Sequence, residues 1–481
     1  QIPHIDTVKS NNLLLEDYHL NKGAHHNMSV WEQFEQQRWI DGATAVHVLI
    51  SFAALAVIYQ LINSYYSPIS HFPGPTWAKL SSFWLAYQCR RTRRSEVVME
   101  LHKKYGDFVR IGPSHVSINN PGAIPLIYGH KTGFTKGPFY DAFVQVTPVV
   151  FNVRSVEEHV RKRKYINASF SSRALLDFEP YMDKEILGWK RKLFGMLQEN
   201  KANLDFVVWT NFLAFDVVAS FAFGSPFGFV ETGEDPDGLI QIIDARGEFM
   251  NAIGSLSSIL RPLMRYHPFD SFWRQGYKAR AGLESIGREA YQRRKSSTGN
   301  RKDLMSYLLA ATDPSTKKSI DEDEIIAESI SFIVGGSDTT SSTMTNFIDF
   351  VSRDTKLQFL LQQELDFFFP GEPAEDWVPS ERETSRLPLM VATLREVMRF
   401  RPTSATGLER ITPTGGRTVV GQFIPSKTFV SVPTVGVMMD PRVFDSPERF
   451  RPQRWLEPGA KKLLENFYPF STGPRACIGR K

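Results

Sequence analysis

A run of twenty residues without formal charge, Ala43–Ile62, limits most strongly how this chain can fold. A helix of that length spans about 30 Å, the thickness of the hydrocarbon core of a bilayer. His47, Ser51 and Gln60 dilute its apolar character, which leaves a buried core helix as the alternative. A cleaved signal peptide fits poorly, because the run is long and its upstream flank is acidic. The run predicts a transmembrane anchor over residues 43–62.

The charges that flank this run predict its orientation. Residues 1–42 carry six acidic and three basic residues, whereas five basic residues follow the run: Lys79, Arg90, Arg91, Arg93 and Arg94. The positive-inside rule therefore places residues 1–42 in the lumen and the remainder of the chain in the cytosol. Met28 is an alternative start of the natural protein. Residues 63–75 form a Pro/Gly linker, in which Pro73, Gly74 and Pro75 end any helix.

Composition excludes several classes of protein. Of the 481 residues, 42% are hydrophobic and 23% charged, which excludes a disordered or fibrous chain. Two cysteines exclude a disulfide framework and a Cys-rich zinc module. A net charge of +5 is too small to indicate a nucleic-acid partner. Residues 76–481 read as one large, mainly α-helical domain with short strands near residues 108–118 and 417–435.

A polar stretch interrupts the best-defined helix. This helix is predicted to start at a capping box, Ser319 to Glu322, and to run to Arg353, about 50 Å. Its middle contains Gly335, Gly336, Asp338 and Thr339 among apolar residues, and each interior glycine costs about 1 kcal/mol relative to alanine. One interpretation is a kink whose threonine hydroxyls bond back to the i−4 carbonyls. The other is a notch where a ligand approaches the backbone beside a proton donor.

A Glu-x-x-Arg pair, Glu396 and Arg399, lies near the C-terminal third of the chain. Residues three apart on a helix face the same side and can pair. In isolation such a pair is an exposed salt bridge worth under about 1 kcal/mol. Its apolar neighbours instead favour a buried pair, for which Arg449 or Arg454 could supply a further partner.

The last residues hold the strongest chemical signal, a cysteine within a glycine-rich loop. A lone cysteine is usually a small buried hydrophobe. Cys477, however, lies between Gly473 and Gly479, which free the backbone to curl around the sulfur. Arg475 adds positive charge that favours the thiolate. A thiolate held in this way is a strong axial donor for haem iron.

This loop resembles the FxxGxRxCxG haem-binding loop of the cytochrome P450 family, with matches at Phe470, Gly473, Arg475, Cys477 and Gly479. The glycine–threonine stretch and the Glu-x-x-Arg pair resemble two further family signatures in the correct order. The resemblance covers about residues 73–481 and implies a mainly α fold with small β-sheets behind the N-terminal anchor. The family continues past the cysteine into a helix and a β-rich tail. We therefore expect that the catalytic domain, residues 76–481, is incomplete at its C-terminus.

The resemblance also implies roles for individual residues. Cys477 would be the axial ligand of the iron of haem b (iron protoporphyrin IX), and Thr339 with Asp338 would deliver protons during catalysis. Glu396, Arg399 and Arg454 would form a structural triad behind the haem. Four basic residues would bind the haem propionates: His159, which replaces the more usual Trp, and Arg163, Arg410 and Arg475.

The implied reaction is monooxygenation, with one oxygen atom of O₂ entering the substrate. Electrons would come from NADPH through a membrane-bound cytochrome P450 reductase, with cytochrome b5 as an optional second donor. The basic run Arg161–Lys164 would suit docking of an acidic reductase, although it could equally be a solvated helix face. The implied location is the endoplasmic reticulum membrane, with a single span, lipid contact and a cytosolic catalytic domain.

Substrate class follows from a narrower resemblance. Residues 133–143, 151–152 and 403–408 resemble pocket-covering segments of fungal benzoate para-hydroxylases, and 36 phenylalanines suit a small lipophilic or aromatic substrate. Fungal secondary metabolism or aromatic-acid metabolism would be the setting. Two rivals remain: a haem-thiolate isomerase or dehydratase that does not use O₂, and a truncated, inactive membrane protein.

Overall fold

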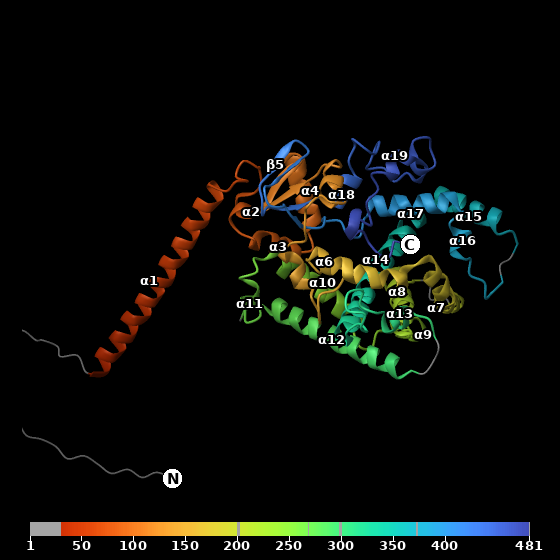
Figure 1. Cartoon of the computed structure of the whole chain (residues 1–481), viewed down its shortest axis with the longest axis horizontal. Coiled ribbons are helices and arrows are strands. Elements are labelled where there is room, and N and C mark those ends of the chain that lie inside the picture. Colours follow the sequence, from red (N-terminus) through yellow and green to blue (C-terminus); the bar gives the residue numbers. More distant parts are fainter. Residues whose placement is uncertain (1–29, 200–202, 268, 298–300, 372–373, 481) are drawn as a thin grey trace, which may run out of the picture. The chain divides into compact units, whose positions relative to one another are not determined.

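A computed structural model describes residues 30–199, 203–267, 269–297, 301–371 and 374–480 (Figure 1). The chain divides into two compact units, Gln1–Ile62 and Asn63–Lys481. Positions 1–29 of the predicted lumenal segment lie outside the described residues. The first unit contributes most of α1 (Val30–Tyr65).

The second unit contains, in chain order, α2 (Thr76–Leu80), α3 (Phe83–Arg90), α4 (Arg94–Tyr105), β1 (Phe108–Gly112), β2 (His115–Ile118), α5 (Ala123–Tyr128), η1 (Pro138–Phe143), α6 (Val156–Ile166), η2 (Asn167–Phe170), α7 (Ser172–Gln198), α8 (Phe206–Phe223), α9 (Phe229–Thr232), α10 (Leu239–Ser255), α11 (Arg261–Met264), α12 (Ser271–Ser296), α13 (Leu304–Ala310), α14 (Glu322–Arg353), α15 (Thr355–Phe368), α16 (Glu381–Thr384), α17 (Pro388–Phe400), β3 (Arg410–Ile411), β4 (Arg417–Val419), β5 (Gln422–Ile424), β6 (Phe429–Ser431), α18 (Thr434–Met438), η3 (Pro452–Trp455), α19 (Ala460–Leu464) and η4 (Gly473–Arg475), where η marks a 3-10 helix.

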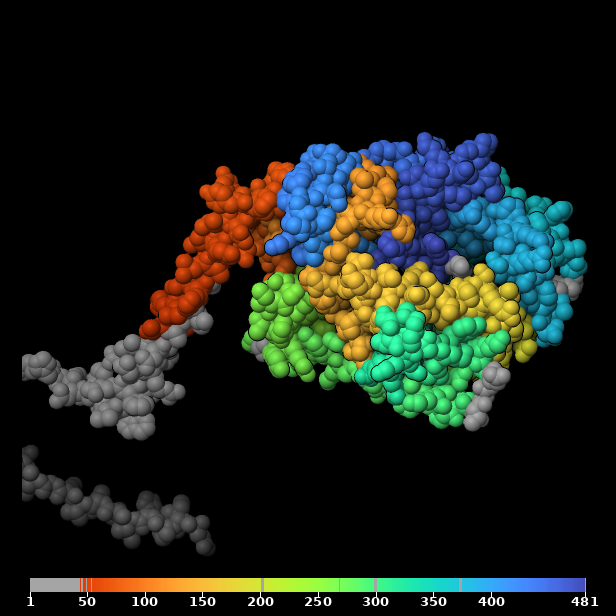
Figure 2. All heavy atoms as spheres, in the orientation of Figure 1, coloured from red at the N-terminus to blue at the C-terminus, as the bar shows by residue number. Residues whose placement is uncertain are grey.

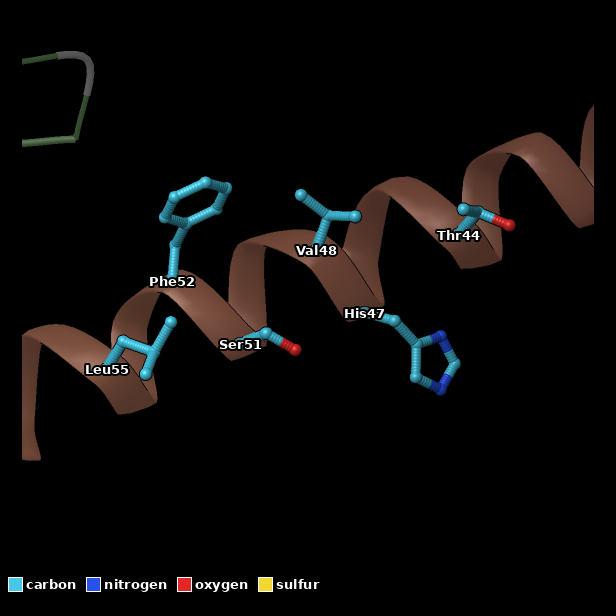
Figure 3. Close-up of a pocket in the computed structure, with 6 residues that line it drawn as sticks. All are labelled: Thr44, His47, Val48, Ser51, Phe52 and Leu55. Atoms are coloured by element: carbon cyan, nitrogen blue, oxygen red, sulfur yellow. The ribbon is translucent and has the colours of Figure 1, made fainter.

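Helix α1 contains the whole uncharged run, and its described apolar side chains are exposed. Residues 46–65 are long and apolar enough to cross a membrane, with none of the segment buried. Six side chains of α1 line a shallow hollow of about 310 Å³ (Figure 3). All six belong to this one helix, so the hollow indicates no binding site. Helix α8 passes the same length and composition test, but 61% of it is buried, which makes it a core helix.

Residues 69–74, which follow α1, pack against the sheet that contains β1 and β2. Ile69 and Phe72 pack in the same apolar cluster as Val116 of β2. The Arg110 amide donates to the Pro73 carbonyl at 2.7 Å. A Cβ at Gly74 would lie 2.1 Å from the Arg110 carbonyl oxygen, so only glycine fits this close approach.

Two small sheets confirm the predicted strand regions. The larger has the strand order β1-β2-β6-β3, and the smaller pairs β4 with β5. Strands β2 and β6 are parallel, with Val116 beside Val430. This pairing joins segments more than 300 residues apart in the sequence. Figure 1 shows β5, α4 and α18 at one end of the second unit, and α15 and α16 at the other.

Helix α14 packs against α8 at the centre of the helical part, where the largest apolar cluster lies. It ends at Arg353, as predicted, but its N-cap is Asp321, whose carboxylate accepts from the Asp323 amide. The predicted capping box at Ser319 is therefore wrong. Ser319 instead forms an isolated β-bridge with Thr312, which holds its backbone in an extended conformation.

Candidate active site

The cysteine loop is closed by backbone contacts and presents an exposed thiol. The Cys477 amide donates to the Phe470 carbonyl at 2.9 Å, so this amide is turned away from the sulfur. Gly473 has a φ of +71°, and a Cβ there would lie 2.1 Å from the Tyr128 carbonyl oxygen. The loop thus requires glycine at this position, as the sequence predicts. The thiol of Cys477 is free and exposed.

Two arginines tie this loop to α6 and to the residues that precede it. Arg163 donates through Nη1 to the Ala476 carbonyl at 3.1 Å. Arg475 donates through Nη1 to the Val153 carbonyl at 2.7 Å and through Nη2 to that of Ser155 at 3.1 Å. Figure 2 shows the blue C-terminal segment against the yellow segments that contain α6. Burial lowers the pKa of Arg163, and the neighbouring Cys477 opposes this effect.

Basic side chains from four segments gather beside the loop. They are His159 and Arg163 of α6, Arg410 of β3, Arg475 of η4 and Lys136. Burial, together with the positive charges of the other four, lowers the pKa of His159 to about 3. All four propionate ligands expected from the sequence are therefore brought together. We call these five residues the basic cluster.

Lys136 is the member of the basic cluster that sequence reasoning missed. It is 5% exposed, and its ammonium group contacts the Phe151 carbonyl. It also lies 4.2 Å from the centre of the Tyr140 ring. Burial, followed by the charges of Arg410 and Arg475, lowers the pKa of Lys136 far below its ordinary value. The only signal in the sequence was a lysine within a phenylalanine-rich segment that resembles a pocket cover.

The basic cluster contains no ion-paired carboxylate. Within the described ranges, no Asp or Glu oxygen lies within 4 Å of a nitrogen of its Lys and Arg members, although Arg410 donates to the Tyr140 hydroxyl at 2.9 Å. Uncompensated buried cations are costly unless an anionic group completes the site. Two carboxylates on one ligand would provide that charge. The cluster therefore fits the two propionates of a haem, and the nearby thiol of Cys477 would bind its iron.

Helix α14 provides a notch in its middle turns. A Cβ at Gly335 would meet no atom within 4 Å, whereas one at Gly336 would lie 2.8 Å from Cγ2 of Val218 on α8. Thr339 is exposed, and its hydroxyl donates to the Gly335 carbonyl at 2.9 Å. The structure thus shows the back-bond of the first interpretation and the open space of the second, while a kink and the approach of a ligand stay predictions.

Asp338 differs from an ordinary surface carboxylate. Burial and the negative charge of Asp244 on α10 raise its pKa to about 6. Among the described residues, no basic side chain forms an ion pair with it, and its one hydrogen bond comes from Ser337 at 3.5 Å. An acid with this pKa exchanges protons readily near neutral pH. Asp244 was not predicted, because nothing in its local sequence indicates proximity to α14.

Glu396 and Arg399 form a fully buried pair, so the exposed-pair interpretation is wrong. Arg399 donates from Nε and Nη2 to the two carboxylate oxygens of Glu396 at 2.9 and 2.8 Å. Arg454 donates to the same carboxylate at 3.1 Å, and the indole of Trp455 donates at 2.9 Å. Arg449 contributes only its carbonyl oxygen, as an acceptor for Arg399 and Arg454. The triad joins α17 to η3.

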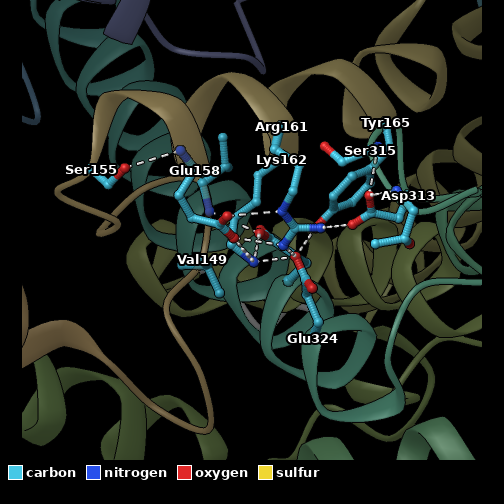
Figure 4. A network of polar contacts seen from close by, with 12 residues as sticks. Val149, Ser155, Glu158, Arg161, Lys162, Tyr165, Asp313, Ser315 and Glu324 are labelled. Carbon is cyan, nitrogen blue, oxygen red and sulfur yellow. Dashed lines mark hydrogen bonds and ion pairs between the residues drawn. The ribbon is translucent and has the colours of Figure 1, made fainter. Parts of the chain in front are cut away.

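Two of the four residues in the basic run Arg161–Lys164, which was predicted to dock an acidic reductase, point into the protein. Arg161 pairs with Glu158 and Glu324 at 2.6 Å, and with Asp313 (Figure 4). Lys162 is buried and pairs with Glu324. These contacts fasten α6 to the first turn of α14. Arg161 and Lys162 are therefore unavailable to a partner, whereas Lys164 is exposed and Arg163 belongs to the basic cluster.

Comparison with known proteins agrees with this geometry. The model of the family described as "Cytochrome P450" matches residues 71–481. The chain belongs to the cytochrome P450 family. Benzoate 4-monooxygenase bphA of Aspergillus niger is 35% identical to this P450 over 89% of the chain and 87% of that protein. Cytochrome P450 monooxygenase ORF11 of Penicillium roqueforti is 30% identical over 90% of the chain and 89% of its own length.

The fold comparison gives the same result. The crystal structure of the cytochrome P450DA heme domain superposes with a TM-score of 0.69 and covers 85% of this chain and 87% of that one, at 18% identity. The chain is thus a cytochrome P450 monooxygenase with the mostly helical P450 fold and small sheets. Its family binds haem iron, and the thiol, basic cluster and glycine notch of this P450 fit that group.

Proposed function

We propose that this P450 holds haem b through Cys477 and inserts one oxygen atom of O₂ into a small aromatic or lipophilic substrate. One observation carries the proposal: an exposed thiol lies beside a basic cluster whose Lys and Arg members have no ion-paired carboxylate among the described residues. The sulfur would bind the iron, and the cluster would bind the propionates. Bound haem supplies O₂ activation and transfer of an oxygen atom to the substrate.

Residues of α14 would control protons in this reaction. Because the Thr339 hydrogen is engaged by the Gly335 carbonyl, the hydroxyl oxygen presents its lone pairs to the notch and can hold a water molecule there. Asp338, with a pKa of about 6, would accept and release the proton that passes along this path. Glu396, Arg399 and Arg454 would act structurally, by holding α17 and η3 together beneath the cysteine loop.

The substrate class rests on likeness and on the walls of the site. One relative is named a benzoate 4-monooxygenase. Aromatic rings in and beside η1 pack on one another, with Phe143 and Tyr140 each 5.8 Å from Phe151. Such a group of aromatic rings near the basic cluster suits contact with an aromatic substrate. We infer that the enzyme acts in aromatic-acid or secondary metabolism and takes a small aromatic acid.

Electron supply and location complete the proposal. The enzyme would receive electrons from NADPH through a membrane-bound P450 reductase, with cytochrome b5 as an optional second donor. Its location would be the endoplasmic reticulum membrane, with α1 as the single anchor and the catalytic unit in the cytosol. The uncharged, outward-facing run in α1 supports the anchor.

A carbon monoxide difference spectrum of the reduced full-length protein tests the thiolate assignment. We expect the thiolate-type Soret band in the wild type and its loss in Cys477→Ala. Cys89→Ala is the matched control, because Cys89 is the other cysteine and lies buried against Ser255. A band that survives Cys477→Ala, or that Cys89→Ala removes, would refute the assignment.

The two rival functions are separated by further readouts. A haem-thiolate isomerase or dehydratase would show the Soret band but turn over its substrate without NADPH. An inactive membrane protein would show no band. The retained Asp338 and Thr339 pair favours the monooxygenase, since neither rival needs protons delivered during O₂ reduction.

A further inference from the structure

A hollow of about 330 Å³ lies on the outer side of η1, away from the basic cluster. Its walls come from η1, α10, α11 and α12, together with Ser258. Four apolar residues and five polar or charged ones line it. They are Ala142, Phe249, Ile253 and Pro262, and Asp141, Ser258, Arg261, Tyr277 and Arg280.

The charge of this hollow is positive. Its one acid, Asp141, is already paired with Arg154 at 2.8 Å. Neither Arg261 nor Arg280 has a carboxylate within 4 Å among the residues that the structure describes. Arg246 lies behind Arg280, with Gln145 bonded to both arginines. Burial and the charge of Arg280 lower the pKa of Arg246 to about 10, which indicates that these two cations repel each other.

The two arginines of the wall differ in how far their donors are used. Arg261 donates to the carbonyls of Pro138, Gly254 and Leu256 at 2.7, 2.8 and 3.1 Å. It therefore joins η1 to α10 and α11. Arg280 makes one such bond, from Nη2 to the Gln145 carbonyl at 3.2 Å. Its Nε and Nη1 donate to no described residue, so its guanidinium group keeps donors for a ligand.

The apolar side of the hollow suits a ring. Phe249 of α10 and Ile253 one turn later are buried behind it, at 1 and 3% exposure, so its accessible apolar surface is that of Ala142, Pro262 and Tyr277. The Tyr277 ring packs 4.8 Å from that of Phe249, which holds it in place. An aromatic face beside a guanidinium group with free donors matches a flat apolar body that ends in a carboxylate. A neutral apolar ligand would leave the arginine charges without a counter-ion.

The short helix η1 alone separates this hollow from the basic cluster. Tyr140 points inward, where its hydroxyl accepts from Arg410, while the next two residues, Asp141 and Ala142, line the hollow. Phe143 packs 5.8 Å from Phe151, whose carbonyl contacts Lys136. A ligand in the hollow is therefore one turn of chain away from the side chains that fit the haem edge.

We propose that this hollow is an outer binding site for small aromatic carboxylic acids, with the carboxylate paired to Arg280 and the ring against Ala142, Pro262 and Tyr277. The inference rests on the proposed function, because the acid bound there is the substrate before it enters the site beside the haem. It adds to that function an entrance that selects substrates with a negative charge.

Equilibrium dialysis of full-length holoenzyme against benzoate and against methyl benzoate tests the site without relying on turnover. We expect Arg280→Met to weaken one class of benzoate binding about tenfold and to leave methyl benzoate binding unchanged. Arg280→Lys should restore most of the benzoate affinity. Arg274→Met is the control, since Arg274 lies exposed on the same helix and outside the hollow. Unchanged benzoate binding in Arg280→Met, or equal loss for acid and ester, overturns the proposal.

The carbon monoxide difference spectrum of each variant separates this test from that of the proposed function. A thiolate-type band in Arg280→Met shows that the fold and the haem site are intact, so that any loss of benzoate belongs to the hollow. Arg280-dependent benzoate binding in a protein without that band would sustain the outer site and sink the monooxygenase proposal. A normal band without Arg280-dependent benzoate binding would support the monooxygenase proposal and refute the outer site.

Discussion

Lys136 shows at the residue scale how a site for an anionic group is built before the group arrives. Its ammonium group is buried beside Arg410 and Arg475, with aromatic rings and one carbonyl as its contacts. Such an arrangement opposes folding of the empty chain, because a buried cation without a counter-ion is unfavourable. With a dicarboxylate bound beside it, the buried ammonium group of Lys136 would instead stabilise the folded protein.

Lys136→Met should therefore have opposite effects on the empty and the loaded protein. We expect the haem-free variant to be more stable than the wild type by about 1–2 kcal/mol in urea. The loaded variant should release haem to an excess of apomyoglobin about tenfold faster. Lys103→Met, at an exposed position of α4, should change neither quantity. Slower haem release, or a less stable empty chain, would contradict this account.

Asp338 is a second residue whose surroundings set its chemistry. Its pKa of about 6 lies above the ordinary 3.8, so the folded chain binds more protons than the unfolded chain between these values. Stability from this group is thus highest at low pH and falls as pH rises from about 4 to 7. Above that range the ionised carboxylate is destabilising.

Asp338→Asn should remove this dependence. We expect the variant to gain about 3 kcal/mol relative to the wild type at pH 7.5 and about 1 kcal/mol at pH 4.5. Urea unfolding of both proteins at the two pH values measures the difference. Glu409 and Glu328, whose pKa values are raised to about 7 and about 8 by burial, titrate in both proteins and cancel. An equal gain at both pH values would show that Asp338 is not the titrating group.

Sequence reasoning at this scale succeeded where chemistry is local. The need for glycine at position 473 follows from a short motif and is confirmed, whereas the role of Cys477 as iron ligand stays a prediction. It failed where contacts join distant segments. Lys136 meets Arg410 across more than 270 residues, and Asp244 reaches Asp338 from another helix, so no pattern within either segment reveals them.

At the scale of an element, helix α14 again shows the difference between what the local sequence indicates and what contacts with distant segments decide. Its two central glycines look equivalent in the sequence, yet they serve different purposes. Gly336 allows α8 to approach, because Val218 occupies the space a side chain would need. Gly335 faces open space and keeps the notch over Thr339 clear. One glycine is thus needed for packing and the other for binding.

Alanine at each position should separate these purposes. Gly335→Ala should stabilise the fold by up to about 1 kcal/mol through helix propensity but weaken carbon monoxide binding to the reduced protein. Gly336→Ala should destabilise the fold by about 1–3 kcal/mol, since Val218 must shift. Urea unfolding and carbon monoxide titration measure the two effects. Equal changes in stability for both variants would contradict the assignment.

Elements were predicted unevenly from the sequence. The end of α14 at Arg353 and the strands near residues 108–118 and 417–435 are confirmed, because local signals mark them. The start of α14 was misplaced by two residues of chain, since Ser319 and Asp321 are both good caps and only the bridge to Thr312 decides between them. The burial of Glu396 likewise depends on η3, which lies more than 50 residues away.

The whole molecule has the predicted architecture, a mainly helical fold with small sheets. The parallel pairing of β2 with β6 could not be predicted, because it depends on chain closure across the entire domain. A surface property also emerges at this scale. Around α11, four large apolar side chains are mostly exposed: Ile259, Leu263, Tyr266 and Phe269, at 84, 61, 78 and 93%. These side chains form an exposed apolar patch, which would suit contact with a lipid surface.

A chain without residues 1–62 should therefore still bind membranes. We expect Ile259→Ser with Leu263→Ser to weaken its binding to phosphatidylcholine vesicles at least tenfold, because two apolar side chains lose their lipid contact. Leu464→Ser, at a 40% exposed position of α19, is the control. Co-sedimentation with vesicles measures the effect. Equal weakening by the control would show that the α11 segment has no special contact with lipid.

The thinness of η1 has a consequence for how such an enzyme can change. Tyr140 faces Arg410 and the next two residues, Asp141 and Ala142, line the arginine-lined hollow, so a substitution there affects both sides. A laboratory evolution experiment that selects new substrates through η1 should thus often recover clones that lose their prosthetic group. Diversity introduced on α10 and α12 would broaden ligand choice while leaving pigment content intact.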